Sequence, residues 1–312
     1  MIKFNSDFWA LVIGGSSGFG LATAQKLSRH GMNLCIVHRD RRGAMSRITP
    51  AFEKLKSTGV KVKTFNIDAL STDGRTNILD VLKDDLGETG KIRMVLHAVA
   101  FGNLKLLAPY NDNGAQKTAR AKIAEATETS AGAIDQIVDK VFDEGADCLH
   151  TLVDPPEYNN SQFLGKNDFV HTIQAMGSNI VEWVQDIFNR KLFAKDARVL
   201  SLTSEGNSIA WKGYAAVAAA KAVLESVSRA MAVEFAPYGI RSNVIQAGVT
   251  DTAALQAIPG NRHIKANAAL RNPFERLTTP IDVANVIFLL CMDEATWING
   301  ALICVDGGER IS

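Results

Sequence analysis

The sequence has 312 residues, 46% of them hydrophobic and 21% charged, with a formal net charge of +1. This composition is typical of a globular protein with enough material for a sizeable core. The balanced charge argues against nucleic acid or an anionic membrane as a partner.

The four cysteines are widely spread along the chain and lack metal-ligand spacing, so we expect free thiols and no metal site. The apolar run at residues 8–13 is too short for a membrane span and leads directly into glycines. No secretory signal pattern is apparent at the N-terminus. We therefore expect a cytoplasmic protein.

Strands and helices alternate along the first hundred residues. The predicted strands are 9–13, 34–37, 61–67 and 94–99, and the predicted helices are 21–30, 51–56 and 75–86. The same rhythm resumes with helix 169–193, strand 198–202, helix 214–235, strand 241–245, helix 281–290 and strand 301–305. Such alternation predicts an α/β protein with one Rossmann-type, doubly wound parallel sheet, forming a single nucleotide-binding domain over 1–312.

Residues 103–166 break this rhythm, because a crossover after the fourth strand needs far fewer residues. Within them, Ile134, Val138 and Phe142 share one face of an amphipathic helix with Ile137 and Val141. We interpret 103–166 as a helical insertion within the domain. A lid, an oligomer contact and a segment without a specific role all remain open.

A glycine-rich turn joins the first strand to the first helix. Gly14, Gly18 and Gly20 stand where the pyrophosphate of a dinucleotide would meet the helix N-terminus. Glycine suits this position because a Cβ would block the tight turn and the approach of phosphate. Similar turns also follow buried strands in proteins that bind no nucleotide.

The end of the second strand bears on the choice of coenzyme. Arg39 lies there, with Arg41 and Arg42 close by, where enzymes that use NAD usually have a carboxylate. A guanidinium suits a 2′-phosphate, so the sequence favours NADPH over NADH. Asp68 follows the third strand and is either an acceptor for the adenine amine or a cap at the strand end.

Tyr214 and Lys221 are the candidate catalytic pair. Seven residues apart, they return to the same face of a helix that begins beyond the carboxyl end of a central strand. A tyrosine whose pKa is lowered by a nearby cation donates well to an oxygen that gains charge during hydride transfer. Ser204 follows the same strand and either binds the substrate oxygen or caps a turn.

Together these residues resemble the short-chain dehydrogenase/reductase family over nearly the whole chain. The landmarks are the turn from Gly14 to Gly20, Asp68, His97 to Ala100, Ser204, Asn243, Ala247-Gly248 and Val305 to Gly308. The family's usual Tyr-x3-Lys is absent, because Ala218 stands four residues before Lys221. The spacing Tyr-x6-Lys instead resembles enoyl-acyl-carrier-protein reductases, particularly their FabL-like branch.

The resemblance implies an NADPH-dependent reduction of a trans-2-enoyl thioester in fatty acid synthesis, with acyl carrier protein or an acyl-CoA as the carrier. Tyr214 would stabilise the enolate oxygen, Lys221 would bind the nicotinamide ribose, and Val249 would hold the carboxamide through its backbone. The resemblance further implies cofactor contacts from Gly14, Ser16, Ser17, Gly18, Phe19, Gly20, Arg39, Asp68, Ala69, Ala98, Val99, Lys221, Gly248, Val249, Thr250 and Thr252. It also implies a homotetramer.

Two features leave the function open. Gln174 stands where many members have an active-site asparagine, so a proton relay through that residue is not assumed. The apolar stretch 253–270 is either a mobile flap over an acyl chain or an ordinary surface helix. The alternative functions are a 3-oxoacyl or ketone reductase, a reductase of cyclic enones or polyketide intermediates, and a non-catalytic NADPH-binding regulator.

Overall fold

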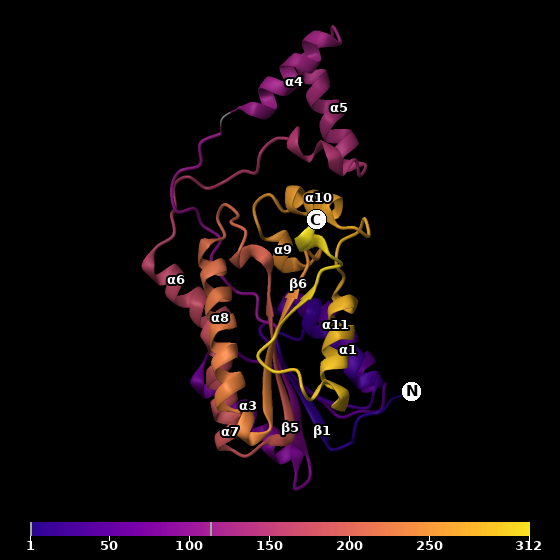
Figure 1. Ribbon diagram of the computed structural model, residues 1–312, viewed down its shortest axis with the longest axis vertical. Helices are drawn as coiled ribbons and strands as arrows, with labels where there is room; N and C mark the ends of the chain where they lie inside the picture. Colours follow the sequence, from indigo (N-terminus) through magenta and orange to yellow (C-terminus); the bar gives the residue numbers. More distant parts are fainter. Residues whose placement is uncertain (1, 113) are drawn as a thin grey trace.

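The protein is built on one parallel sheet. A computed structural model describes residues 2–112 and 114–312 and contains seven strands in the order β3-β2-β1-β4-β5-β6-β7 (Figure 1). The strands are β1 (Phe8–Ile13), β2 (Asn33–His38), β3 (Val62–Asn66), β4 (Lys91–His97), β5 (Phe193–Thr203), β6 (Ile240–Ala247) and β7 (Leu302–Val305). All neighbouring strands are parallel, which confirms the predicted Rossmann-type fold.

Helices cover both faces of the sheet and make a three-layer sandwich (Figure 1). One face carries α1 (Gly18–Arg29), α2 (Met45–Lys56) and α11 (Pro280–Leu290), and the other carries α3 (Thr72–Leu86), α7 (Asn179–Asn189) and α8 (Ala215–Glu234). Every residue of β2 is buried, as expected for a strand covered on both sides. The carboxyl ends of all seven strands therefore lie at one edge of the sheet, where the strand order reverses between β1 and β4.

The segment before β5 differs from its prediction as one continuous helix. The chain forms α6 (Lys166–Ile173), a π-helical turn (Gln174–Ser178) and then α7, which ends four residues before the predicted position. Gly177 lies in the turn, and a Cβ there would sit 2.8 Å from the backbone oxygen of Ala220. Close packing against α8 thus accompanies the irregular turn. Hydrophobic periodicity does not reveal it, because α6 buries Thr172 alone and therefore offers little apolar periodicity.

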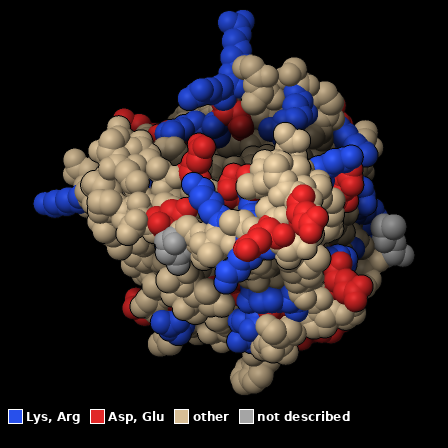
Figure 2. Space-filling view, turned by 90° about the horizontal axis from the view of Figure 1, so that it is seen from above, with Lys and Arg blue, Asp and Glu red and all other residues tan. Residues whose placement is uncertain are grey.

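The insertion is helical, as predicted, and extends from the end of the molecule where α9 (Ala253–Gln256) and α10 (Asn261–Arg271) lie (Figure 1). It contains α4 (Ala115–Ala126), α5 (Ala131–Asp143) and a 3-10 turn (Asp147–Thr151), and residue 113 within it lies outside the described residues. Arg120 is buried between α4 and α5 and pairs with Asp135, Asp139 and Asp154. Seen from this end, basic and acidic side chains are interspersed over the surface (Figure 2).

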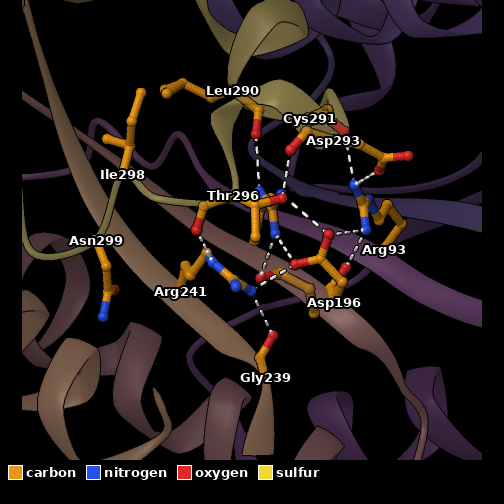
Figure 3. A network of polar contacts seen from close by, with 12 residues as sticks. Arg93, Asp196, Gly239, Arg241, Leu290, Cys291, Asp293, Thr296, Ile298 and Asn299 are labelled. Atoms are coloured by element: carbon orange, nitrogen blue, oxygen red, sulfur yellow. Dashed lines mark hydrogen bonds and ion pairs between the residues drawn. The ribbon is translucent and has the colours of Figure 1, made fainter.

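A cluster of arginines joins the amino ends of the central strands (Figure 3). Arg93, Arg198 and Arg241 all contact the carboxylate of Asp196 at the start of β5. The guanidinium groups of Arg93 and Arg198 also donate to the backbone oxygens of Cys291 and Leu290 at the end of α11. They thereby satisfy carbonyl groups that the end of a helix leaves unpaired.

Among the described helices, none is long and apolar enough to cross a membrane.

Candidate active site

Tyr214 and Ser204 meet at the carboxyl edge of the sheet. Ser204 follows β5 directly, Tyr214 precedes the first residue of α8, and their hydroxyl oxygens are 3.4 Å apart. The Ser204 side chain does not cap the short helix that follows it. Gly206 makes room for the phenol ring, since a Cβ there would lie 2.5 Å from Cε1 of Tyr214. The two hydroxyls can therefore contact one substrate oxygen together.

The protonation of Tyr214 differs from the expectation. Burial raises the pKa of the phenol above its ordinary value, and the hydrogen bond with Ser204 opposes that shift only in part. The structure thus shows no lowering of the pKa by a cation. Tyr214 is a neutral phenol at physiological pH and is suited to donate a hydrogen bond or a proton.

Lys221 lies beneath this pair, on the buried side of α8. Its ammonium donates to the backbone oxygen of Leu202, 2.8 Å away. Burial lowers the pKa of Lys221 to about 8, although the nearby charge of Glu225 acts in the opposite direction. Glu225 also accepts hydrogen bonds from Thr203, at 2.7 Å, and from Asn207. It therefore fixes the loop that carries Ser204 to the helix that carries Lys221.

Next to Lys221 the structure contains buried polar atoms without protein partners. Both ring nitrogens of His97 and the hydroxyl of Ser201 lack hydrogen bonds within residues 2–112 and 114–312. The two residues are paired in register across β4 and β5. Burial, followed by the charge of Lys221, lowers the pKa of His97 to about 3, so the ring is neutral. Such atoms need a water or a ligand, which fits a polar group bound at this edge.

The glycine-rich turn has the shape that a dinucleotide requires. Gly14 has φ +90°, and a Cβ there would sit 2.5 Å from the backbone oxygen of Ala98. A Cβ at Gly20 would contact the backbone of Gly14. Helix α1 begins at Gly18 with no acidic residue in its first turn, so its N-terminus can accept an anion. Ser16, Ser17 and Phe19 lie in or next to this turn, while Ala98 donates its N–H to Ile13.

Arg39 and Asp68 lie together beyond β2 and β3. Nη1 of Arg39 is 2.6 Å from Oδ2 of Asp68, and the guanidinium lies 5.0 Å from the ring centre of Phe101. About half of the Arg39 side chain remains exposed, so it can reach a ligand. Asp40 is turned away from this role, because its carboxylate contacts Nδ1 of His38 at 2.9 Å. This arrangement leaves a cation at the position that distinguishes the two coenzymes.

The backbone of Val249 is already engaged by the protein. Its N–H donates to Oε2 of Glu309 at 3.1 Å, and its carbonyl accepts from the N–H of Thr278, also at 3.1 Å. The carbonyl oxygen retains a second lone pair that can accept a hydrogen bond from a carboxamide. The only N–H of Val249, in contrast, is already donated to Glu309. A contact of the Val249 N–H with a nicotinamide therefore requires Glu309 to release it. Gly248 is packed closely here, since a Cβ would lie 2.4 Å from Oγ1 of Thr278.

Glu309 belongs to a pair of ion pairs with Arg271 that the sequence pattern did not predict. Nη2 of Arg271, at the end of α10, lies 2.6 Å from Glu205 and 3.2 Å from Glu309. Burial raises the pKa of Glu309 to about 7. These ion pairs join the end of α10 to the residue after Ser204 and to the loop after β7.

Thr252 caps α9, accepting from the N–H of Leu255, and Thr250 donates to the carbonyl of Gly248.

A pocket of about 350 Å³ opens beside Tyr214. Its lining comes from residues 105–111 at the start of the insertion and from Gly206, residues 210–215 and Ala218 around the start of α8. The lining is mainly apolar and aromatic, and it includes Tyr110 from the insertion and Trp211 from the loop before α8. A substrate in this pocket would lie directly against the Tyr214 phenol. The described residues contain no cluster of three or more His, Cys, Asp or Glu side chains that could hold a metal.

Two family models match the chain. Residues 9–140 match the KR domain, and residues 164–309 match the model described as enoyl-(acyl carrier protein) reductase. Together with the fold and the Tyr214 site, these matches show that the chain belongs to the short-chain dehydrogenase/reductase family. Within that family it resembles the enoyl-acyl-carrier-protein reductases.

Curated relatives catalyse varied reactions. The chain is 36% identical over 123 residues to 1-cyclohexenylcarbonyl-CoA reductase of Streptomyces collinus, covering 39% of this chain and 44% of that protein. It is 25% identical over 305 residues to peroxisomal 2,4-dienoyl-CoA reductase of Mus musculus, covering 97% of this chain and 84% of that protein. The matches span less than half the length of the first three curated relatives.

Solved structures share the fold at low sequence identity. FabI from Candidatus Liberibacter asiaticus superimposes with a TM-score of 0.73 and 18% identity, covering 100% of this chain and 98% of that one. A short-chain dehydrogenase from Burkholderia cenocepacia, solved with NADP, gives 0.69 and 19%, covering 97% of this chain and 98% of that one. The likeness extends over the whole sheet.

Proposed function

We propose that the protein is an NADPH-dependent reductase of trans-2-enoyl thioesters, the reaction of an enoyl-acyl-carrier-protein reductase. The observation that carries the proposal is the pairing of the Tyr214 and Ser204 hydroxyls, 3.4 Å apart, at the mouth of an apolar pocket. The family match over residues 164–309 and the fold of FabI support it. Fatty acid synthesis is the process in which such a reaction has its place.

The chemistry follows from the positions of these side chains. A bound NADPH would supply the hydride for C3 of the enoyl group. Tyr214, a neutral phenol, donates to the thioester oxygen as that oxygen gains negative charge, and Ser204 donates to the same oxygen. Lys221 contributes a buried positive charge below the pair and binds the ribose hydroxyls. The apolar walls of the pocket exclude water from the developing enolate.

NADPH is the proposed coenzyme because Arg39 is half exposed at the end of β2 and Asp40 is engaged with His38. The unpaired atoms of His97 and Ser201 and the closely packed Gly14 fit a nucleotide at the same edge. Solved relatives of this fold have been crystallised with NAD and with NADP.

We propose that the acyl group arrives on acyl carrier protein or coenzyme A. We also propose that the protein acts in the cytoplasm as a homotetramer.

A second function has its own support. The KR-domain match over residues 9–140 favours reduction of a 3-oxoacyl group or ketone, where Tyr214 and Ser204 would donate to the carbonyl that is reduced. The two reactions differ in the substrate carbon that receives the hydride. They need the same hydroxyl pair, so only the substrate distinguishes them.

The test follows NADPH absorbance with crotonyl and acetoacetyl thioesters, using wild type and Tyr214→Phe. The proposal predicts oxidation with the crotonyl thioester alone, lost in the variant. Turnover of only the acetoacetyl thioester would replace it with the ketone reductase function. NADPH binding without turnover of either substrate, unchanged in the variant, would indicate a non-catalytic regulator.

A further inference from the structure

The insertion has two stems, residues 105–111 and residues 158–164, which are paired with each other beside the active site. The N–H of Leu164 donates to the carbonyl of Leu106 at 2.8 Å, and Leu106 forms a parallel bridge with Phe163. The side-chain amide of Asn160 binds the backbone of Tyr110 on both sides, accepting from its N–H at 2.8 Å and donating to its carbonyl at 3.2 Å. The backbone of Tyr110 is thus fixed where it lines the pocket.

The ring of Tyr110 is held as firmly as its backbone. It packs against the ring of Tyr158 from the second stem, with centroids 5.0 Å apart, and the ammonium of Lys212 lies 5.0 Å from its centre. Burial raises the pKa of Tyr158, so that ring is a neutral phenol, and the two rings present flat aromatic faces to each other. We call residues 105–111, with the Tyr158 ring packed against Tyr110, the wall of the pocket, which Tyr214 also lines.

The rest of the insertion is anchored to α10, which keeps the wall in place. Phe142 and Val153 pack on Ala266, and both ring nitrogens of His263 contact insertion backbone oxygens, at 2.8 Å for His150 and 3.0 Å for Asp154. The indole of Trp211 donates to the carbonyl of Pro259 at 3.2 Å. The stems, α10 and the loop after β5 are consequently joined around one pocket of about 350 Å³.

We propose that this wall makes the protein selective for compact enoyl groups, short or with a single ring, and that Tyr110 is the residue that excludes long linear chains. The proposal rests on the enoyl reductase function above and specifies its substrate. A pocket of this volume is at the lower end of the range for ligand sites. A long chain would have to displace the stacked rings or extend into water, and neither gives it additional contact.

The test compares crotonyl-CoA, cyclohexenylcarbonyl-CoA and trans-2-dodecenoyl-CoA as substrates. An accommodated chain would raise kcat/KM by about fourfold for each buried methylene. We expect no such rise from crotonyl to dodecenoyl in the wild type, and turnover of the cyclic substrate. In Tyr110→Ala, we expect the dodecenoyl-to-crotonyl ratio of kcat/KM to increase at least about tenfold.

Matched variants separate the wall from general effects. Tyr110→Phe keeps the stacked ring and should behave as the wild type. Leu107→Ala opens the same wall at a residue that is 66% exposed, and it should raise the ratio even if Tyr110→Ala folds poorly. Tyr238→Ala removes a tyrosine before β6, at the amino edge of the sheet, and should leave the ratio unchanged.

Binding provides a readout that does not depend on turnover. Quenching of Trp211 fluorescence by butyryl-CoA and dodecanoyl-CoA, with Trp211→Phe as the reference, measures how affinity depends on chain length. Two results would overturn the proposal that the wall excludes long chains. One is equal or tighter binding of dodecanoyl-CoA than of butyryl-CoA by the wild type, and the other is a dodecenoyl-to-crotonyl ratio of kcat/KM that Tyr110→Ala leaves unchanged. Absence of turnover with all three enoyl substrates overturns the enoyl reductase function instead, and the binding series then decides the wall alone.

Discussion

The ammonium group of Lys221 donates to the backbone oxygen of Leu202, two residues before Ser204. This contact fixes a charge below the two hydroxyls, but the same burial that positions the charge lowers the pKa of Lys221 to about 8. Tyr214 moves in the other direction, because burial raises the pKa of its phenol. The cation is consequently lost at a lower pH than the phenol proton.

The first prediction concerns this order of titration. NADPH affinity should decrease as pH rises through about 8, because the ammonium that we propose to bind the ribose hydroxyls becomes neutral. Titration of NADPH fluorescence across this range gives the dissociation constant. Lys221→Met should bind weakly with no step near pH 8, whereas Tyr214→Phe should keep the step. A step that persists in Lys221→Met would assign it to another group.

Coenzyme preference gives the second prediction. Arg39→Leu should weaken NADPH binding about tenfold to a hundredfold, because a charge-assisted contact to the 2′-phosphate contributes about 1.5–3 kcal/mol. NADH binding should change little, and Arg42→Leu serves as the matched control on the same loop. Calorimetric titration with both coenzymes measures the effect. Equal losses for NADH and NADPH in Arg39→Leu would contradict a role in recognising the phosphate.

The third prediction concerns Glu309. Its pKa of about 7 in the folded protein exceeds its ordinary value of 4.5, so the folded state binds more protons between these values. Through this group, the free energy of unfolding should fall as pH rises from about 4.5 to 7, by about 3 kcal/mol at most. Glu309→Gln should lose that dependence while Glu234→Gln retains it, as measured by urea unfolding at each pH. Parallel curves for the two variants would show that Glu309 is not the titrating group.

Much of the fold could be predicted because β1, the middle of β2 and the second half of β4 are apolar runs separated by amphipathic helices. Helix α4 of the insertion was not predicted. It is mostly polar, and its buried contacts are those of Arg120 and Ala124, which leave little apolar periodicity in the sequence.

The candidate site divides in the same way. Ser204 was predicted either to bind the substrate oxygen together with Tyr214 or to cap a turn, because both residues follow the carboxyl end of the same strand, a position that topology fixes. The contacts of Arg271 with Glu205 and Glu309 depend instead on the paths of three loops, which no local pattern encodes. Glu225 had a usable signal, since it lies one turn after Lys221 on the same helix.

The last prediction tests the arginine cluster of Figure 3. Asp196→Ala should lower the free energy of unfolding by about 3–5 kcal/mol, because it leaves Arg93 and Arg198, both nearly fully buried, without their shared carboxylate. Asp293 also pairs with Arg93, yet its side chain is 92% exposed, so Asp293→Ala should cost no more than about 1 kcal/mol. Urea unfolding of both variants measures the difference. Because the cluster lies at the amino ends of the strands, NADPH affinity of folded Asp196→Ala should match that of the wild type. Equal small losses of stability would mean that the bonds from Arg93 and Arg198 to the carbonyls ending α11 hold this edge without Asp196.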